Sequence, residues 1–456
     1  MHYANELIVC YTTFMLPNEF IDEIQKNTAD IKDFNLDEFI QSYDLPAVKS
    51  LRINTLKGDI VKFLSINDFN ISEGDVVKWC PTGFYYDDND ANPCGKHPYH
   101  SAGVYYIQEA SAMAPVEEMH IEKGDMVLDL CASPGGKSTQ IATHLGNEGL
   151  LVCNEPVLDR ARILSENIER MGIGNAVVLN HKPEELSDRF AGFFDKILVD
   201  APCSGEGMFR KNNAAISEWS IDNVKMCSDR QKYIFAEAVK MLKPGGRIVY
   251  STCTFSKMED EENAEYFVNS DESLNFVKMH KIWPHKEKGE GHFLAVFEKE
   301  SEENNRKYVE EKGINEKEIK EFFNFESEVL KNKLKDILPY DFRYVIFGED
   351  LYALHASMLS LKGLKVLRPG LHLGKLKKGR FEPAHAFALF LNKNEVKNCV
   401  DIDLNVAKRY LHGETFNAEG NKGFNLICID GYSLGWGKLS NDIMKNHYPK
   451  GLRSQW

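Results

Sequence analysis

The sequence predicts an α/β protein built around a doubly wound parallel sheet, and three observations predict it. Short apolar runs typical of buried strands alternate with helix-like segments between about residues 121 and 299, an order typical of parallel sheets covered by helices. Several of these runs lead directly into polar motifs that contain glycine or cysteine. The length of 456 residues exceeds what one hydrophobic core usually organises, so we expect further domains around this core.

The expected elements of the core follow one another in a regular order. Strands are expected at 126–130, 149–154, 176–180, 196–200, 247–252 and 292–298. Helices are expected to begin at Ser138, Leu158, Ile221 and Glu259. Residues 243–247, Lys-Pro-Gly-Gly-Arg, are predicted to form the turn before the fifth strand, because proline and glycine favour tight turns.

The ends of three expected strands carry the candidate functional residues. The first strand runs into Cys131 and a glycine-bearing turn, the fourth into Asp200 and Cys203, and the fifth into Cys253. Because α/β proteins bind ligands at the carboxyl ends of their parallel strands, a cofactor loop and two thiols are expected to share one cleft.

The glycine-bearing turn suits a cofactor other than a nucleoside triphosphate or a dinucleotide. Gly136, Lys137 and Ser138 match the end of a Walker phosphate loop, but Cys131 stands where that loop needs its first glycine. The pattern Gly-x-Gly-x-x-Gly of dinucleotide sites is also absent after this strand. Residues 133–136 would let a ligand approach backbone amides at a helix start.

The composition is that of a soluble globular protein in a reducing compartment. Hydrophobic residues make up 43% of the chain and charged residues 27%. The ten cysteines include no Cys-x-x-Cys pair, which favours free thiols and a cytoplasmic location. The apolar run from Leu7 to Leu16 is short and has no Lys or Arg before it. It predicts neither a signal peptide nor a membrane span, and no membrane partner is expected.

Charge is distributed unevenly along the chain. The net charge of −14 argues, as an average, against a nucleic-acid partner. Residues 365–456, however, contain 15 Lys and Arg against 8 Asp and Glu. A basic C-terminal segment on an acidic body favours local docking on phosphate, and a lysine-rich surface without that role is the alternative interpretation.

Together these motifs resemble a known enzyme family. Residues 131–138, 200–207 and 251–254 look like the cofactor loop, the Pro-Cys motif and the Thr-Cys motif of the Sun-type (nucleolar protein/Sun) RNA cytosine-5 methyltransferases. Residues 435–438 and 445–453 resemble the small RNA-binding module that ends the bacterial ribosomal RNA small subunit methyltransferase F branch of that family. The resemblance covers nearly the whole chain.

The resemblance implies a domain organisation for the chain. A Rossmann-like class I methyltransferase core would occupy residues 121–299, preceded by an N-terminal α+β RNA-associated module at 1–120. A C-terminal β-rich, PUA-like RNA-binding region would occupy 322–456. Between the last two, the Glu-, Lys- and Asn-rich segment 300–321 is predicted to be a charged linker or an exposed helix.

The resemblance also implies the chemistry. The cofactor would be S-adenosylmethionine and the acceptor carbon 5 of a cytosine, activated by a thiolate that adds to carbon 6. Spacing does not tell which thiol attacks, because DNA cytosine-5 methyltransferases use the Pro-Cys thiol. The family assigns Cys253 as the nucleophile, Cys203 to release of the methylated base and Asp200 to the cytosine edge. The implied cofactor-binding residues are Cys131, Ala132, Ser133, Pro134, Gly135, Gly136, Lys137, Glu155, Arg160 and Asp200.

Three positions qualify this assignment. Many family members carry an aspartate near the adenine where this chain has Lys182, so no adenine contact is predicted there. The segment 94–100, Cys-Gly-Lys-His-Pro-Tyr-His, has a spacing that suits zinc but lacks a clear fourth ligand, so no metal is predicted. A basic loop is formed by Lys375, Lys377, Lys378 and Arg380 beside Phe381. The preferred interpretation is that this loop contacts phosphate, and the alternative is that it is a solvated hairpin tip.

The sequence therefore predicts an S-adenosylmethionine-dependent RNA cytosine-5 methyltransferase that acts on small-subunit ribosomal RNA. The same reaction on transfer RNA is the first alternative. A non-catalytic ribosome-assembly factor is a second, and the intact Asp200, Cys203 and Cys253 argue against it. A DNA methyltransferase is disfavoured by the order of the motifs and by the C-terminal module.

Overall fold

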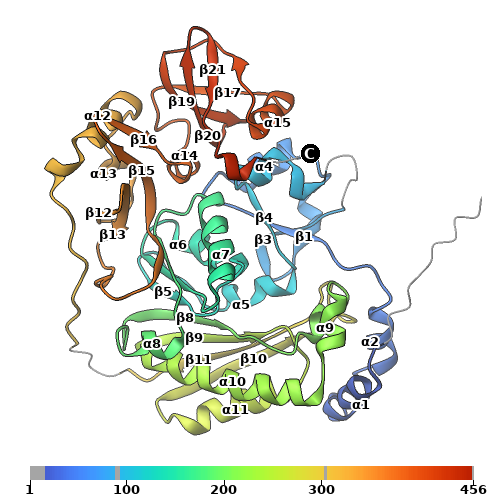
Figure 1. Ribbon diagram of the computed structural model, residues 1–456. Helices are drawn as coiled ribbons and strands as arrows, with labels where there is room; N and C mark the ends of the chain where they lie inside the picture. The colour runs from blue at the N-terminus through green and yellow to red at the C-terminus, as the bar shows by residue number, and fades with distance from the viewer. Residues whose placement is uncertain (1–15, 88–92, 302–305, 454–456) are drawn as a thin grey trace, which may run out of the picture.

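The computed structural model describes residues 16–87, 93–301 and 306–453. Most of the N-terminal apolar run, from Leu7 to residue 15, lies outside the described residues. Figure 1 shows a central sheet with helices on both sides, and the N-terminal and C-terminal parts packed around it. Among the described helices, none combines the length and apolarity needed to cross a bilayer.

Within the described residues the central sheet has eight strands, in the order β10–β11–β9–β8–β5–β6–β7–β14. Their bounds are β5 (Met126–Asp129), β6 (Leu150–Asn154), β7 (Ala176–Leu179), β8 (Phe194–Asp200), β9 (Leu242–Thr252), β10 (Leu274–Ile282), β11 (His292–Lys299) and β14 (Val366–Pro369). Strands β5 to β9 pair in parallel, and β10, β11 and β14 join antiparallel. The predicted doubly wound α/β fold is confirmed.

The predicted elements differ from the observed ones in detail. Strand β9 already begins at Leu242, and its register with β8 jumps from Leu242 opposite Phe194 to Arg247 opposite Lys196. The predicted turn is therefore a bulge inside the strand. Edge strand β10 was not predicted because six consecutive side chains along it are exposed, which leaves no apolar alternation.

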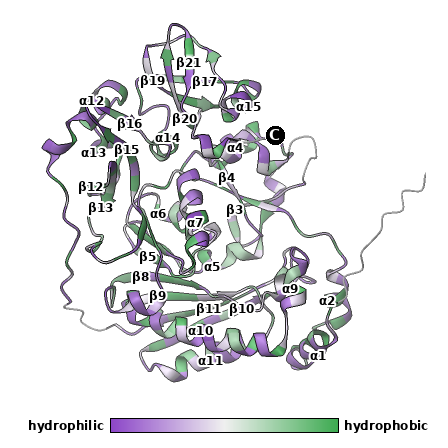
Figure 2. Cartoon of the chain, in the orientation of Figure 1, coloured by the Kyte–Doolittle hydropathy of each residue, from purple (hydrophilic) through white to green (hydrophobic). Residues whose placement is uncertain are grey.

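Helices cover both faces of the sheet and bury an apolar layer on each. Val116, Ile141 and Leu164 belong to the core on one face, and Phe235 and Phe267 to the core on the other. Figure 2 shows hydrophobic strands between helices whose outer faces are hydrophilic, as the hydrophobic effect requires. The first face is covered by α5 (Ala114–Glu117), α6 (Gly136–Leu145) and α7 (Leu158–Arg170), and the second by α8 (Pro183–Ser187), α10 (Ile221–Met241) and α11 (Glu261–Ser270).

The N-terminal part packs against the functional edge of the core. Its sheet has the order β2–β3–β1–β4. The fully buried Arg52 donates from Nη2 to Thr139 Oγ1 at 2.7 Å and to Gly136 O at 3.3 Å, which ties this sheet to the start of α6. The elements are α1 (Asn18–Asn27), α2 (Leu36–Ser42), β1 (Ser50–Ile53), α3 (Ile60–Ile66), β2 (Val76–Val77), β3 (Cys80–Tyr85), α4 (Pro98–Ser101) and β4 (Tyr105–Ile107).

The C-terminal part contains two further sheets. The first sheet has the order β12–β13–β15–β16. Its strands are β12 (Phe342–Phe347), β13 (Asp350–His355), β15 (Leu371–Lys377) and β16 (Arg380–Pro383), and the helices of this region are α12 (Lys320–Val329), α13 (Leu334–Ile337) and α14 (His385–Phe390). The second sheet has the order β17–β19–β20–β21–β18. Its strands are β17 (Cys399–Asp401), β18 (Phe416–Asn417), β19 (Gly423–Ile429), β20 (Tyr432–Ser440) and β21 (Ile443–Asn446), and the helix of this region is α15 (Leu404–His412).

The end of the segment that was predicted to be a charged linker belongs to the folded C-terminal part. Residues 302–305 lie outside the described residues. The last residues of the segment are helical, and Ile319 is fully buried in the same core as Phe322. The folded unit therefore includes Ile319 and α12.

Candidate active site

The two candidate thiols meet at the carboxyl edge of the central sheet. Strands β8 and β9 end side by side, with Asp200 opposite Ser251, and the loops that follow bring Cys203 Sγ to 3.1 Å from Cys253 Sγ. The backbone N–H of Cys253 also points at Cys203 Sγ, at 3.3 Å. The hydrogen bond with Cys253, and then burial, raise the pKa of Cys203 well above its usual value. Cys203 therefore carries its proton at neutral pH.

Backbone contact holds the two cysteine loops together. Gly207 N–H donates to Cys253 O at 2.8 Å. A Cβ at Gly207 would lie 3.1 Å from Cys253 O and 2.9 Å from Gly291 O, so the close approach requires glycine. The hydroxyls of Ser204 and Thr254 are also hydrogen bonded to each other at 2.8 Å.

Two buried side chains clamp the Cys203 loop on either side of the thiol. Gln231 Nε2, from α10, donates to Pro202 O at 3.0 Å and to Glu259 Oε2 at 2.7 Å. The same Glu259 oxygen accepts from Ser204 N–H at 3.1 Å. Burial raises the pKa of Glu259 to about 7, because the charged carboxylate loses its hydration there.

Replacing Glu259 by glutamine is expected to change how stability depends on pH. Because the folded-state pKa of about 7 exceeds the usual value of 4.5, the native protein binds this proton more tightly than the unfolded chain. Stability from this group is complete below pH 4.5 and falls by roughly 3 kcal/mol as pH rises to 7. Glu259→Gln lacks this loss, so its unfolding free energy should rise relative to wild type with increasing pH.

Urea unfolding of both proteins between about pH 4.5 and 8 measures this difference. Parallel stability curves for wild type and Glu259→Gln would show that Glu259 does not carry the proton.

Asp200 lies at the centre of a small charged cluster. Lys137 Nζ lies 2.7 Å from Asp200 Oδ2, and Ser251 Oγ donates to Oδ1 at 2.8 Å. His292 Nε2, on β11, lies 3.6 Å from Oδ1. Burial acting by itself would raise the pKa of Asp200, but Lys137 and then His292 lower it below its usual range. The site therefore presents a carboxylate and an ammonium as one ion pair.

The cofactor loop borders a cavity of about 220 Å³ that reaches this cluster. The loop turns at Gly135, whose φ of +112° favours glycine, and α6 starts at the next residue. Asp129 also lines the cavity: its Oδ2 accepts from Ser138 Oγ at 2.6 Å, while Oδ1 has no hydrogen-bond partner among the described residues. Burial raises the pKa of Asp129 to about 7. The lining from the loop and its surroundings is Cys131, Ala132, Ser133, Pro134, Gly136, Lys137, Asp129 and Asp200, with Tyr106–Glu109 and Ala112 opposite.

Glu155 and Arg160 form an ion pair beside the cofactor loop. Glu155 follows β6, is 2% exposed, and accepts from Val157 N–H at 2.9 Å. Arg160 Nη2 lies 3.4 Å from Glu155 Oε2 and donates to Ser133 O at 3.2 Å. Neither side chain lines the 220 Å³ cavity.

The remaining predicted positions are held by protein contacts. In the basic loop, Lys375 and Arg380 form ion pairs with Asp350 and Glu382 at 3.9 and 2.7 Å. Lys377 pairs with Glu349 in the same way. Lys378 lies at the exposed turn between β15 and β16. Much of the positive charge predicted for phosphate is thus offset by neighbouring carboxylates.

Two further segments have ordinary structural surroundings. Lys182 precedes α8, and its backbone N–H donates to Glu185 Oε2 at 3.0 Å. His97 Nε2 lies 3.4 Å from Asp68, and its Nδ1 accepts from Tyr99 N–H. In the part of the chain that the structure describes, no group of three or more His, Cys, Asp and Glu side chains is placed to hold a metal ion.

Comparisons with known proteins follow the order of the domains. Four family models match: N-terminal domain of 16S rRNA methyltransferase RsmF at 16–110, 16S rRNA methyltransferase RsmB/F at 116–298, RsmF rRNA methyltransferase first C-terminal domain at 324–391, and methyltransferase RsmF PUA domain at 397–454. The ribosomal RNA small subunit methyltransferase F of Vibrio vulnificus is 31% identical over 472 residues, which cover 97% of this chain and 98% of that protein. The chain belongs to the RsmF family.

Other RsmF proteins and solved structures agree. The ribosomal RNA small subunit methyltransferase F of Vibrio campbellii is 31% identical, with 96% and 97% of the two chains covered. NSun6 from Pyrococcus horikoshii, in a crystal structure with SFG, has a TM-score of 0.54 at 19% identity and covers 63% of this chain and 99% of its own. A methyltransferase homolog from Pyrococcus horikoshii has a TM-score of 0.52 at 24% identity, covering 62% and 100%. These two share the RsmF fold, and the predicted family is confirmed.

The structure adds residues to the RsmF site that sequence reasoning missed. His292 and Ser251 contact or approach Asp200, and Gln231 and Glu259 hold the Cys203 loop. Ser251 is the first residue of the segment 251–254 that resembles the Thr-Cys motif, so its position was available as a signal. His292 and Gln231 come from elements distant in sequence, and no local pattern marks them.

Proposed function

We propose that this protein transfers a methyl group from S-adenosylmethionine to carbon 5 of a cytosine in small-subunit ribosomal RNA, through a covalent cysteine adduct. The observation that carries the proposal is the pair of thiols 3.1 Å apart beside the Asp200–Lys137 ion pair. The membership of the RsmF family supports ribosomal RNA as the substrate class.

The residues that line the cavity beside the cofactor loop suit the polar groups of S-adenosylmethionine. Asp129 Oδ1, buried and without a hydrogen-bond partner among the described residues, offers an acceptor for a donor group of a ligand. The backbone of residues 131–136 lines the same cavity near the start of α6, where amides favour polar ligand groups. When bound, the cofactor supplies an electrophilic methyl group.

The raised pKa of Cys203 supports a role for this thiol in release of the product rather than in the attack. Cys203 has a strongly raised pKa and stays protonated, which suits a proton donor better than an attacking thiolate. We assign the attack on carbon 6 to Cys253. After methylation, a water molecule accepts the carbon 5 proton, the electron pair of that C–H bond forms the double bond to carbon 6, and Cys253 leaves with the electron pair of its bond to carbon 6. Cys203 can then donate its proton to the departing sulfur across 3.1 Å and regain a proton from solvent.

Asp200 and Lys137 are suited to hold the cytosine edge. The carboxylate accepts from the exocyclic amine or a protonated ring nitrogen, and the ammonium donates to the ring carbonyl. Asp200 is the last residue of β8 and Lys137 lies in the first turn of α6, and both side chains line the cavity. The ion pair is thus a preformed polar contact that strengthens as charge develops on the ring.

The decisive experiment is nucleoside mass spectrometry of small-subunit ribosomal RNA after incubation with purified protein and labelled S-adenosylmethionine. The proposal expects label in 5-methylcytidine. Label in another nucleoside, or transfer to transfer RNA with none to ribosomal RNA, would reject it.

Replacing Glu155 is expected to weaken cofactor binding. The family resemblance gives Glu155 the ribose hydroxyls, and loss of a hydrogen bond to a charged group costs roughly 1.5–3 kcal/mol, or about 10- to 150-fold in Kd. Calorimetry with S-adenosylmethionine tests Glu155→Ala against Asp159→Ala, an exposed carboxylate on the neighbouring α7. Equal affinities in the two variants would remove Glu155 from the cofactor site.

A further inference from the structure

A second and larger cavity lies in the first C-terminal sheet domain, away from the thiols. It has a volume of about 700 Å³, is open to solvent on one side, and is lined by α12, the segment around α13, and strand β12. Cavities of roughly 300–1,000 Å³ are the usual size of sites for small molecules and nucleotides. None of its lining residues belongs to the candidate active site.

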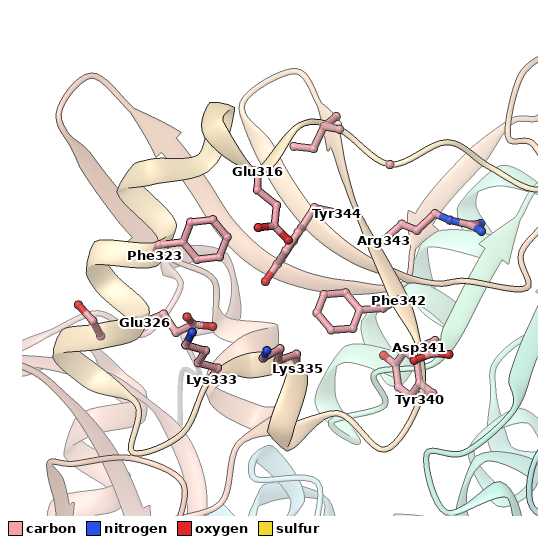
Figure 3. Close-up of a pocket in the computed structure, with 13 residues that line it drawn as sticks. Glu316, Phe323, Glu326, Lys333, Lys335, Tyr340, Asp341, Phe342, Arg343 and Tyr344 are labelled. Atoms are coloured by element: carbon pink, nitrogen blue, oxygen red, sulfur yellow. The ribbon is translucent and has the colours of Figure 1, made fainter.

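Partly exposed aromatic rings form the walls of this cavity. Figure 3 shows Phe323, on the helix, and Phe342, on the strand, facing each other across the opening, with Tyr344 between them. The Tyr344 ring contacts both phenylalanines edge-on. Its centroid lies 5.1 Å from the Phe342 ring centroid and 5.9 Å from the Phe323 ring centroid. Phe342 and Tyr344 alternate along β12 and therefore share one face of the sheet. Such rings are platforms on which unpaired bases stack.

The charges of the cavity are balanced. Lys333 and Lys335 are exposed, and no carboxylate among the described residues lies within ion-pair distance of either. The third cation, Arg343, is engaged by carbonyl oxygens and by Glu310. The three carboxylates of the lining are Glu316, Glu326 and Asp341. A phosphate gains little from this balance, whereas the edge of a base presents both donors and acceptors to match it.

We propose that this cavity binds one unpaired nucleobase of the RNA substrate, stacked against the aromatic wall that Phe342, Tyr344 and Phe323 form. The inference rests on RNA being the substrate under the proposed function, and it adds a contact remote from the methylated cytosine. Stacking supplies the affinity, and the side chains of Lys335, Glu316 and Asp341 meet the base edge.

The test is the affinity of naked small-subunit ribosomal RNA for wild type and Phe342→Ala, measured by filter binding over a range of salt. Loss of one stacking surface should raise Kd roughly 5- to 150-fold. The slope of log Kd against log salt should stay unchanged, because no phosphate contact is lost. Phe342→Tyr should bind as wild type does, because it keeps the ring. A fully paired RNA duplex should bind wild type and Phe342→Ala equally.

Phe347→Ala is the matched control, because Phe347 is exposed on the same strand but outside the cavity. It should leave the affinity unchanged. Unchanged RNA affinity in folded Phe342→Ala, an equal loss in Phe347→Ala, or a reduced salt slope would each overturn the inference. If Phe342→Ala does not fold, Phe323→Ala gives the same test from the helix side.

Two further outcomes distinguish this inference from a cavity that binds a protein segment and from a failure of the proposed function. A variant that binds naked RNA normally but binds the ribosomal subunit poorly would show that the cavity takes a protein segment, and would overturn it. Wild-type protein that neither binds nor methylates ribosomal RNA would instead reject the proposed function. Normal methyl transfer by wild type, together with normal RNA binding by Phe342→Ala, would reject this inference and leave the proposed function standing.

Discussion

Cys253→Ala is expected to lower the rate of methyl transfer by about 10⁴-fold or more, because the thiolate that adds to carbon 6 and so activates carbon 5 is removed. No covalent protein–RNA species should form. Methyl transfer from labelled S-adenosylmethionine to small-subunit ribosomal RNA measures the first effect, and a denaturing gel measures the second.

Cys203→Ala is expected to fail at a later step. Cys253 can still attack, but without the neighbouring thiol at 3.1 Å its sulfur leaves without a proton donor. A denaturation-resistant adduct should therefore accumulate. An adduct in Cys253→Ala that disappears in Cys203→Ala would reverse the two roles.

A third thiol provides the control for both variants. Cys227 is 4% exposed on α10, and its Sγ lies 3.8 Å from Asn223 Oδ1. Cys227→Ala removes a more deeply buried thiol near the same loops and should retain both transfer and release. Normal transfer in Cys253→Ala and Cys203→Ala alike, with both proteins folded and bound to RNA, would contradict a covalent mechanism.

Asp200→Asn is expected to lower kcat/KM for RNA by roughly 10²- to 10⁴-fold. Asparagine keeps the volume but loses the negative charge that pairs with Lys137 at 2.7 Å. Single-turnover transfer with saturating cofactor measures the effect on the chemical step. A loss confined to cofactor affinity would place Asp200 outside the catalytic group.

The same strand offers a matched control for Asp200. Asp195, at the other end of β8, pairs with Lys243 at 2.7 Å, far from the thiols along the strand. Asp195→Asn removes the same charge from a similar ion pair and should leave transfer near the wild-type rate. Equal losses in the two variants would indicate a general effect on the fold.

The core fold could be predicted from sequence because its strands are buried on both faces. Such strands appear as continuous apolar runs, as in β6 and β7, which are buried throughout. Strand β10 escaped prediction because it is an exposed edge, and β14 because it reaches the sheet from the C-terminal part. Pairing between segments so distant in sequence leaves no local pattern.

The candidate site, like the fold, could be predicted from the sequence only in part. The meeting of Cys203 and Cys253 was predictable because both follow parallel strands that end at one edge. The contacts of Glu259 were not, because the predicted helix starts two residues later, at Glu261, and leaves Glu259 free to cap the Cys203 loop. The ion pair of Lys375 with Asp350 in the basic loop depends on β13 lying beside β15.

The central claim is that Cys253 attacks the cytosine, and RNA that contains 5-fluorocytosine tests it most directly. Fluorine at carbon 5 cannot leave as a proton does, so the covalent species is trapped in the wild-type enzyme. After nuclease and protease digestion, mass spectrometry should find the methylated fluorocytidine nucleotide on the peptide that contains Cys253. The same nucleotide on the peptide that contains Cys203, or no modified peptide while ordinary RNA is methylated, would contradict the account.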